Sequence, residues 1–119
     1  FCKVEKKRVI YETRYIFVIR DLFPVTHLHS LIIPKRHLPT YFDLDEKELN
    51  DLNEVLRHQR DDILRKDNTV SGFNIGINDG EDAGQTIFHC HVHLIPRRKD
   101  DTPNPRGGIR GVIPEKQQY

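Results

Sequence analysis

The segment TIFHCHVHLIP, residues 86–96, decides the fold because its side chains alternate in the manner of a β-strand. Successive side chains of a strand point to opposite faces, so His89, His91 and His93 would share one face. The other face would carry the residues between and beside them: Phe88, Cys90, Val92 and Leu94. We therefore predict a strand that packs one face on the core and presents three imidazoles on the other.

The segments before this strand supply the rest of a sheet and one helix. Residues 70–77, VSGFNIGI, alternate in the same way, and the following Asn78-Asp79-Gly80 is a typical turn sequence. Residues 43–65 are expected to form a helix, because Asp43 and Glu46 resemble an N-terminal cap and leucines recur at helical spacing. Three further strands are predicted at residues 7–13, 15–19 and 29–34.

Together these elements predict an α+β fold, in which a five-stranded antiparallel meander packs against one long helix. Residues 1–119 are expected to form a single domain. Only the Pro- and Gly-rich tail, residues 99–119, changes composition enough to predict irregular structure.

Charge and hydropathy exclude several classes of partner. Nineteen Lys and Arg against eighteen Asp and Glu leave a net charge of +1, too balanced to predict binding to nucleic acid or to anionic lipid. No apolar run reaches the length of a membrane span, and residues 1–12 lack the apolar core of a signal peptide. With only two cysteines and no disulfide scaffold, the expected location is the cytoplasm.

Three interpretations fit a cluster of histidines. A solvated strand face without function is disfavoured by their number. Metal binding by all three is strained, since a strand separates the Cα atoms of His89 and His93 by about 13 Å, whereas tetrahedral zinc holds its ligand atoms about 3.3 Å apart. A metal site would therefore need other ligands, and the nearest candidates are His29, His37 and Cys2.

Covalent catalysis is the third interpretation. If His91 donates its Nδ1 hydrogen to a backbone carbonyl, its Nε2 keeps a lone pair that can attack an electrophile. His89 and His93 would then supply N–H donors to the negative charge that builds in the transition state. Because imidazole is a good nucleophile toward activated phosphorus, the pattern predicts a phosphoryl centre as the electrophile.

The pattern His-x-His-x-His followed by two apolar residues resembles the signature of the histidine triad (HIT) family. The tail from residue 96 onward resembles that of small bacterial members of the family. Three other segments add to the resemblance: Asn78-Asp79-Gly80, Gly84-Gln85-Thr86 and HSLIIPKRH at 29–37. It implies a HIT-like fold, a two-fold homodimer and a nucleotide as the substrate.

The resemblance also implies roles by position. His91 matches the nucleophile that forms a nucleotidyl-histidine intermediate, and His93 matches the histidine that contacts the scissile phosphate. His89 matches the histidine that supports the nucleophile, and His29 the fourth histidine of the active site. Asp21 stands at the ribose-binding position. The phosphate-contacting positions are Asn78, Gln85 and Thr86, although turn chemistry alone would explain Asp21 and Asn78 equally well.

Some members of the family resemble zinc proteins, in which two N-terminal cysteines join two histidines. The matching residues are Cys2, His37 and His89, and the other cysteine would precede Phe1. These residues could hold a structural zinc ion, or His37 could be an ordinary surface residue. The covalent mechanism requires no metal in either case. The arginines of residues 97–110 are expected to be solvated, with binding of a second phosphate as the alternative.

The sequence thus predicts a hydrolase that acts at the α-phosphorus of a nucleotide, by resemblance a purine nucleotide, and releases a nucleoside monophosphate. Its substrate would be a dinucleoside polyphosphate or a nucleoside phosphoramidate. A catalytically weak nucleotide sensor and a zinc-binding HIT-like protein are the alternatives.

Overall fold

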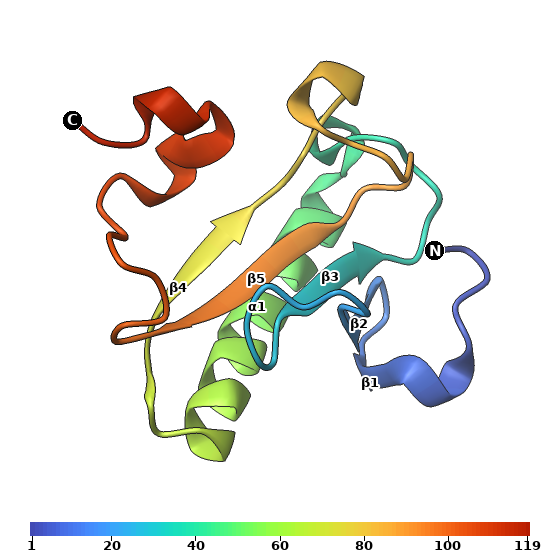
Figure 1. Cartoon of the computed structure of the whole chain (residues 1–119). Helices are drawn as coiled ribbons and strands as arrows, with labels where there is room; N and C mark the ends of the chain where they lie inside the picture. Colours follow the sequence, from blue (N-terminus) through green and yellow to red (C-terminus); the bar gives the residue numbers. More distant parts are fainter.

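The computed structural model describes all 119 residues and contains one α-helix and one five-stranded antiparallel sheet (Figure 1). The strands and the helix are β1 (Val9–Glu12), β2 (Ile16–Arg20), β3 (Ser30–Pro34), α1 (Glu46–Lys66), β4 (Val70–Gly76) and β5 (Val92–Arg98). Short 3-10 helices occur at Lys6–Arg8, Tyr41–Asp43, Glu81–Ala83, Gly108–Val112 and Pro114–Lys116. The predicted α+β class, with five antiparallel strands and one long helix, is confirmed.

The predicted meander is wrong in its second half. The order of the strands is β1-β2-β3-β5-β4, because the connection through α1 carries the chain to the far edge and β5 returns between β3 and β4. Leu31 of β3 and Gly76 of β4 both pair with His93. The end of the histidine segment therefore lies inside the sheet, with a strand on each side.

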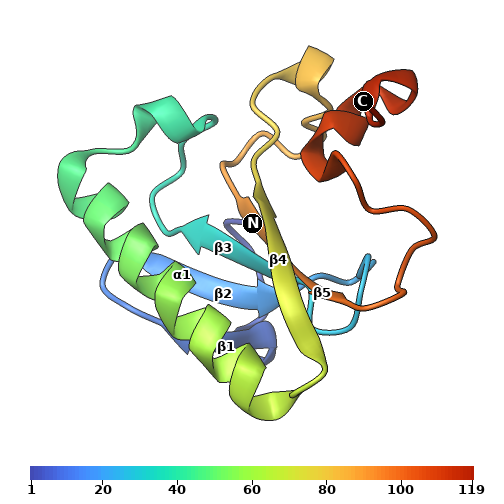
Figure 2. The same ribbon diagram turned by 90° about the vertical axis from the view of Figure 1, so that its left-hand side faces the viewer.

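The core lies between the sheet and α1, which covers one face of the sheet (Figure 2). Val92 and Leu94 of β5 pack in this cluster with Leu52 and Val55 of the helix. Burying each such side chain contributes about 1.5–3 kcal/mol. Because neighbours along a strand alternate, His93 projects from the face opposite the helix.

The N-cap of the helix lies two residues later than the sequence predicted. Its N-cap is Asp45, whose side chain accepts a hydrogen bond from the backbone of Glu48 while Glu48 returns one to the backbone of Asp45. Asp43 instead closes the 3-10 turn before the helix, where it accepts from Thr40. Neither α1 nor any other helix combines the length and the apolar character that crossing a membrane requires.

The last strand was predicted from residue 86, but β5 begins only at Val92. The preceding segment bonds to the loop after β3 rather than to a neighbouring strand: the Cys90 amide donates to the Leu38 carbonyl at 2.8 Å. Cys90 is buried with Leu38, whereas Phe88, predicted on the core face, is exposed. His89 and His91 therefore do not lie on a regular strand with His93.

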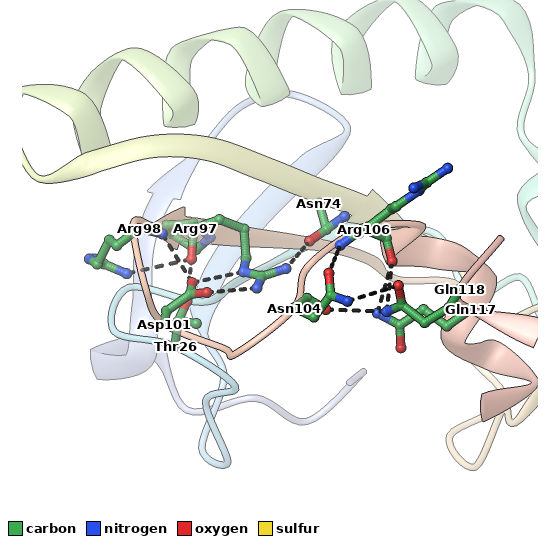
Figure 3. Close-up of polar contacts among 10 residues, drawn as sticks. Thr26, Asn74, Arg97, Arg98, Asp101, Asn104, Arg106, Gln117 and Gln118 are labelled. Carbon is green, nitrogen blue, oxygen red and sulfur yellow. Dashed lines mark hydrogen bonds and ion pairs between the residues drawn. The ribbon is translucent and has the colours of Figure 1, made fainter. Parts of the chain in front are cut away.

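The tail after β5 contains two 3-10 turns, and it folds back beside β4 (Figure 1). Figure 3 shows the polar contacts that hold it. Arg97 joins Asp101 to Asn74 of β4, with distances of 2.7 Å to each. Gln118 bonds to Asn104 near the start of the tail. The tail is thus fastened to the sheet edge.

The arginines of this region make contacts within the chain, and Arg106 and Arg110 are also exposed to solvent. Arg98 pairs with Asp67 at 2.9 Å, and Arg97 pairs with Asp101. Arg106 and Arg110 both place their guanidinium groups over the ring of Tyr119.

Candidate active site

One cavity of about 320 Å³ brings together residues from four separate segments of the chain. It is lined by His91 and His93, which occupy the end of the histidine segment and the start of β5. All four residues predicted to bind nucleotide also line it: Asp21, Asn78, Gln85 and Thr86. His29 lies directly behind His93, whereas His89 does not line the cavity.

His91 has the hydrogen-bonding pattern that the sequence analysis required of a nucleophile. Its Nδ1 lies 2.9 Å from the backbone carbonyl oxygen of His89. A carbonyl can only accept, so Nδ1 carries the hydrogen and Nε2 of the neutral ring keeps a lone pair. Nε2 has no hydrogen-bond partner within the chain. Every buried polar side-chain atom does have such a partner, so Nε2 is not buried and is accessible from the cavity. The ring of Phe1 packs edge-on against His91 with 4.8 Å between centroids.

His93 and His29 form a buried pair beside this ring. His29 Nε2 lies 2.9 Å from His93 Nδ1 and 3.5 Å from Asp21 Oδ2. Burial lowers the pKa of His93 to about 4, helped by the charges that His91 and His29 would carry. Burial also lowers the pKa of His29, against the opposing influence of Asp21. Both rings are therefore neutral at pH 7.

The predicted nucleotide-binding residues differ in what they can still donate or accept. Asp21 Oδ1 accepts from the Phe23 amide at 2.8 Å in a local turn, which leaves Oδ2 toward His29 and the cavity. Thr86 is exposed, and neither its hydroxyl nor the side chain of Asn78 bonds to another residue of the chain. Both are free to meet a ligand.

Gln85 lines the cavity, but in this structure its side-chain amide is engaged by other parts of the protein; its contact with a phosphate stays a prediction. Its Nε2 donates to the carbonyls of Pro39 and Ile87, and its Oε1 accepts from the Gly80 amide. In this structure both amide hydrogens are used, one by the loop after β3 and one by the loop that carries Gln85. In this structure Gln85, only 3% exposed, holds the loop in shape.

The ring of His89 turns away from the cavity into a second cluster, with Cys2 and His37. His37 Nδ1 lies 3.2 Å from both Cys2 Sγ and His89 Nδ1, and Sγ lies 3.5 Å from His89 Nδ1. His89 Nε2 donates to the Pro34 carbonyl at 2.7 Å, so its Nδ1 is a free lone pair. Tetrahedral zinc holds nitrogen and sulfur ligands about 3.3–3.7 Å apart. The three side chains therefore fit three corners of a zinc site, and the chain supplies no fourth.

Several residues that shape the cavity belong to no pattern that can be recognised in the sequence. Phe1 and Arg8 reach it from the N-terminal segment, and Leu22 and Phe23 from the loop after β2. Single aromatic or basic residues outside a repeating pattern carry no periodicity to detect. The remaining two histidines, His27 and His58, are exposed and do not line the cavity.

The chain is similar to known proteins in sequence and in fold. The HIT domain profile matches residues 3–100. The bis(5'-nucleosyl)-tetraphosphatase [asymmetrical] of Schizosaccharomyces pombe is 43% identical over 94 residues, which are 79% of this chain and 51% of that protein. The chain thus spans about half the length of that relative.

Two solved structures share the fold. Plasmodium falciparum diadenosine triphosphate hydrolase, in complex with cyclomarin A, has a TM-score of 0.78 and 32% identity over 85% of this chain and 68% of its own. A Zn-bound histidine triad family protein from Mycobacterium smegmatis has a TM-score of 0.70 and 35% identity over 81% of this chain and 69% of its own. The profile match spans both the histidine segment and the sheet that positions it, and the chain therefore belongs to the HIT domain family.

Proposed function

We propose that the protein hydrolyses a dinucleoside polyphosphate by two successive displacements at the α-phosphorus, with His91 as the nucleophile. The observation that carries the proposal is the 2.9 Å contact between His91 Nδ1 and the His89 carbonyl oxygen, which assigns the ring hydrogen to Nδ1 and leaves the Nε2 lone pair for the cavity. The relatives named as tetraphosphatase and diadenosine triphosphate hydrolase support a purine dinucleotide over a phosphoramidate.

In the first step the Nε2 lone pair of His91 forms a bond to the α-phosphorus. The bond from phosphorus to the bridging oxygen breaks, and its electron pair leaves on the nucleoside polyphosphate. Negative charge on the phosphoryl oxygens is met by the ring N–H of His93, the Thr86 hydroxyl and the Asn78 amide, all of which line the cavity. Arg8 lines the same cavity and adds positive charge.

In the second step a water oxygen attacks the same phosphorus on the nucleotidyl-histidine. The phosphorus–nitrogen bond breaks, its electron pair returns to Nε2 of His91, and a nucleoside monophosphate is released. Asp21 Oδ2 is proposed to accept from the ribose hydroxyls, since Oδ1 is already used by the Phe23 amide. His29 and the backbone of His89 do not contact the substrate: His29 hydrogen-bonds to the ring of His93, and the His89 carbonyl accepts from the ring of His91.

Cys2, His37 and His89 are proposed to hold a structural zinc ion, with the fourth ligand from outside these residues. The ion would tie the N-terminal segment to the loop after β3 and take no part in the displacements. We also propose a homodimer, as the resemblance to the family implies.

The test is hydrolysis of diadenosine tetraphosphate in water enriched in oxygen-18. We expect AMP and ATP as products, with the label in AMP only, because water adds to the α-phosphorus that His91 has captured. A substrate made chiral at that phosphorus should react with net retention, since two in-line displacements each invert it.

The matched control is His91→Asn, which should lose at least about 10³-fold in kcat while still binding nucleotide. Label in ATP, or net inversion, would exclude His91 as a covalent nucleophile. Tight binding without turnover by the wild type would instead identify a nucleotide sensor.

A further inference from the structure

A second cavity lies between the N-terminal segment, residues 1–8, and the β1 edge of the sheet (Figure 1). Its volume is about 570 Å³, against about 320 Å³ for the cavity of the active site. Its apolar side chains include Phe1, Val4, Val9, Ile10, Tyr11 and Phe17. An apolar cavity of about 300–1,000 Å³ with a few polar groups is typical of a small-molecule site. We call it the N-terminal cavity.

The floor of the N-terminal cavity belongs to the face of the sheet that α1 does not cover. Ile19, Leu31 and Ile33 form a buried apolar cluster on this face. Four side chains that pack against the cluster are only partly buried, and all four line the cavity: Phe1, Val4, Val9 and Phe17. The N-terminal segment therefore covers this face incompletely and leaves apolar surface accessible inside the cavity.

A β-bulge in the edge strand shapes the cavity wall. Val9 of β1 pairs with Ile19 and Tyr11 pairs with Val18, so Ile10 is an extra residue without a partner on β2. Ile10 lines the cavity and is 44% exposed. Bulges redirect side chains and are frequent at sheet edges and beside binding sites. Here the bulge adds another apolar side chain to the wall.

The charged residues of the cavity leave one positive charge in excess. Lys35 Nζ lies 2.7 Å from Glu12 Oε2, so these two charges cancel. Lys6 also lines the cavity, and the neighbouring Glu5 pairs with Lys7 rather than with Lys6. The hydrogen bond from Lys35 is the main cause that lowers the pKa of Glu12, and the charge of Lys6 lowers this pKa further, so Lys6 is near the same carboxylate. The cavity thus complements an apolar molecule that carries one negative charge.

Phe1 is shared by the two cavities and belongs to the lining of both. Its ring lies edge-on to His91, with 4.8 Å between centroids, and edge-on to His89, with 6.0 Å. The adjacent Cys2 lines the N-terminal cavity and contacts His37. A molecule that packs on Phe1 in one cavity therefore restricts the same ring in the other.

We infer that the N-terminal cavity binds a small molecule with an apolar body and a single anionic head group, and that this molecule is linked to the active site through Phe1. The apolar body packs on Val4, Val9 and Phe17, and the head group pairs with Lys6. The binding site does not depend on the proposed function. Only the link does, because it is measured as a change in the affinity for a nucleotide.

The first experiment titrates the protein with anilinonaphthalene sulfonate, an aromatic molecule with one negative charge whose fluorescence rises in apolar surroundings. We expect one bound molecule per chain, both without AMP and with saturating AMP. Absence of binding would overturn the inference, as would full competition by AMP, which would place the probe in the active site. Loss of binding at concentrations where the chain self-associates would also overturn it, because a second copy would then cover the cavity.

Lys6 and Lys7 provide a matched pair of variants for the head group. Lys6 lines the cavity, whereas Lys7 does not. Lys6→Gln should weaken the anionic probe about three- to fivefold, as expected for an exposed ion pair, and should leave binding of phenylnaphthylamine, the same body without the sulfonate, unchanged. Lys7→Gln should leave both affinities unchanged. Equal weakening of the anionic probe by the two variants would overturn the assignment of the head group to Lys6.

Val4 tests the apolar wall. Val4→Asp places a carboxylate among apolar side chains and should weaken both probes by at least about tenfold, whereas Val4→Leu keeps the wall apolar and should retain both affinities. Circular dichroism of the two variants controls for the fold. Unchanged binding to a folded Val4→Asp would show that the probes bind elsewhere and would overturn the inference.

The link is measured by calorimetry as the affinity for AMP with and without the bound probe. Each ligand immobilises the Phe1 ring, so the second ligand is spared that cost, and the probe should tighten AMP binding about two- to fivefold. AMP should tighten probe binding by the same factor. Phe1→Ala should abolish the effect and Phe1→Tyr should keep it.

These results separate the inference from the proposed function. An unchanged or weakened affinity for AMP in the wild type, or an effect that persists in Phe1→Ala, would overturn the link through Phe1. Binding of the probe as expected, with no binding or hydrolysis of nucleotides, would overturn the proposed function and support the N-terminal cavity as a binding site.

Discussion

Replacing Asp21 with asparagine should weaken recognition of the ribose while leaving the loop intact. The turn depends on Oδ1, which accepts from the Phe23 amide at 2.8 Å, and asparagine keeps that oxygen. What changes is Oδ2, the oxygen proposed to accept from the ribose hydroxyls, which becomes an NH₂ group. A hydrogen bond to a charged group contributes about 1.5–3 kcal/mol, so kcat/KM for a ribonucleotide should fall about 10- to 100-fold.

The assay compares diadenosine tetraphosphate with its 2′-deoxy counterpart, for the wild type and for Asp21→Asn. The wild type should prefer the ribose form, and the variant should lose most of that preference. Thermal unfolding controls for the fold, with Asp21→Ala as the reference that also removes the bond to Phe23. If kcat/KM falls equally for both substrates while the melting temperature is unchanged, Asp21 acts through His29 and the ribose assignment is wrong.

Three further outcomes are expected. His91→Ala should bind a non-hydrolysable dinucleotide within about threefold of the wild type by calorimetry yet form no nucleotidyl-enzyme, whereas a variant with more than a tenth of the wild-type kcat would show that another group attacks. Burial lowers the pKa of His93 to about 4, against 6.5 for the free side chain, so the unfolded state binds more protons than the folded state between these pH values. The denaturant midpoint of unfolding should therefore fall as the pH falls through this window, and it should fall less in His93→Asn. An equal dependence of the midpoint on pH in the two proteins would contradict a buried neutral ring. Exhaustive chelation should leave the rate within about threefold when circular dichroism is unchanged; a collapse that zinc reverses, without loss of structure, would make the histidines catalytic metal ligands.

The sequence predicted the elements of the fold better than their boundaries and order. Alternation and helical spacing are local, so all five strands and the helix were found from the residues themselves. The return of β5 between β3 and β4 depends on pairing across the sheet, which no local pattern encodes. The late start of β5 has a similar cause, because the Cys90 amide bonds to Leu38, more than fifty residues earlier.

The sequence predicted which residues belong to the site, and the structure adds the hydrogen-bond and packing partners of their side chains. His91 and His93 line one cavity with Asp21, as expected from their positions. The commitment of the Gln85 amide to the carbonyls of its own surroundings, and the edge contact of Phe1 with His91, depend on how distant loops meet. Contacts between segments that are distant in the sequence cannot be predicted from local sequence patterns.

His89 joins the two clusters through different parts of one residue. Its carbonyl oxygen receives the hydrogen of His91, and its ring lies with Cys2 and His37. Every amino acid has a carbonyl, so a substitution at position 89 can abolish the thiol–imidazole cluster without deleting the acceptor that orients the attacking ring. The proposed catalytic role and the proposed zinc site are therefore separable, and a substitution can test one without removing the other.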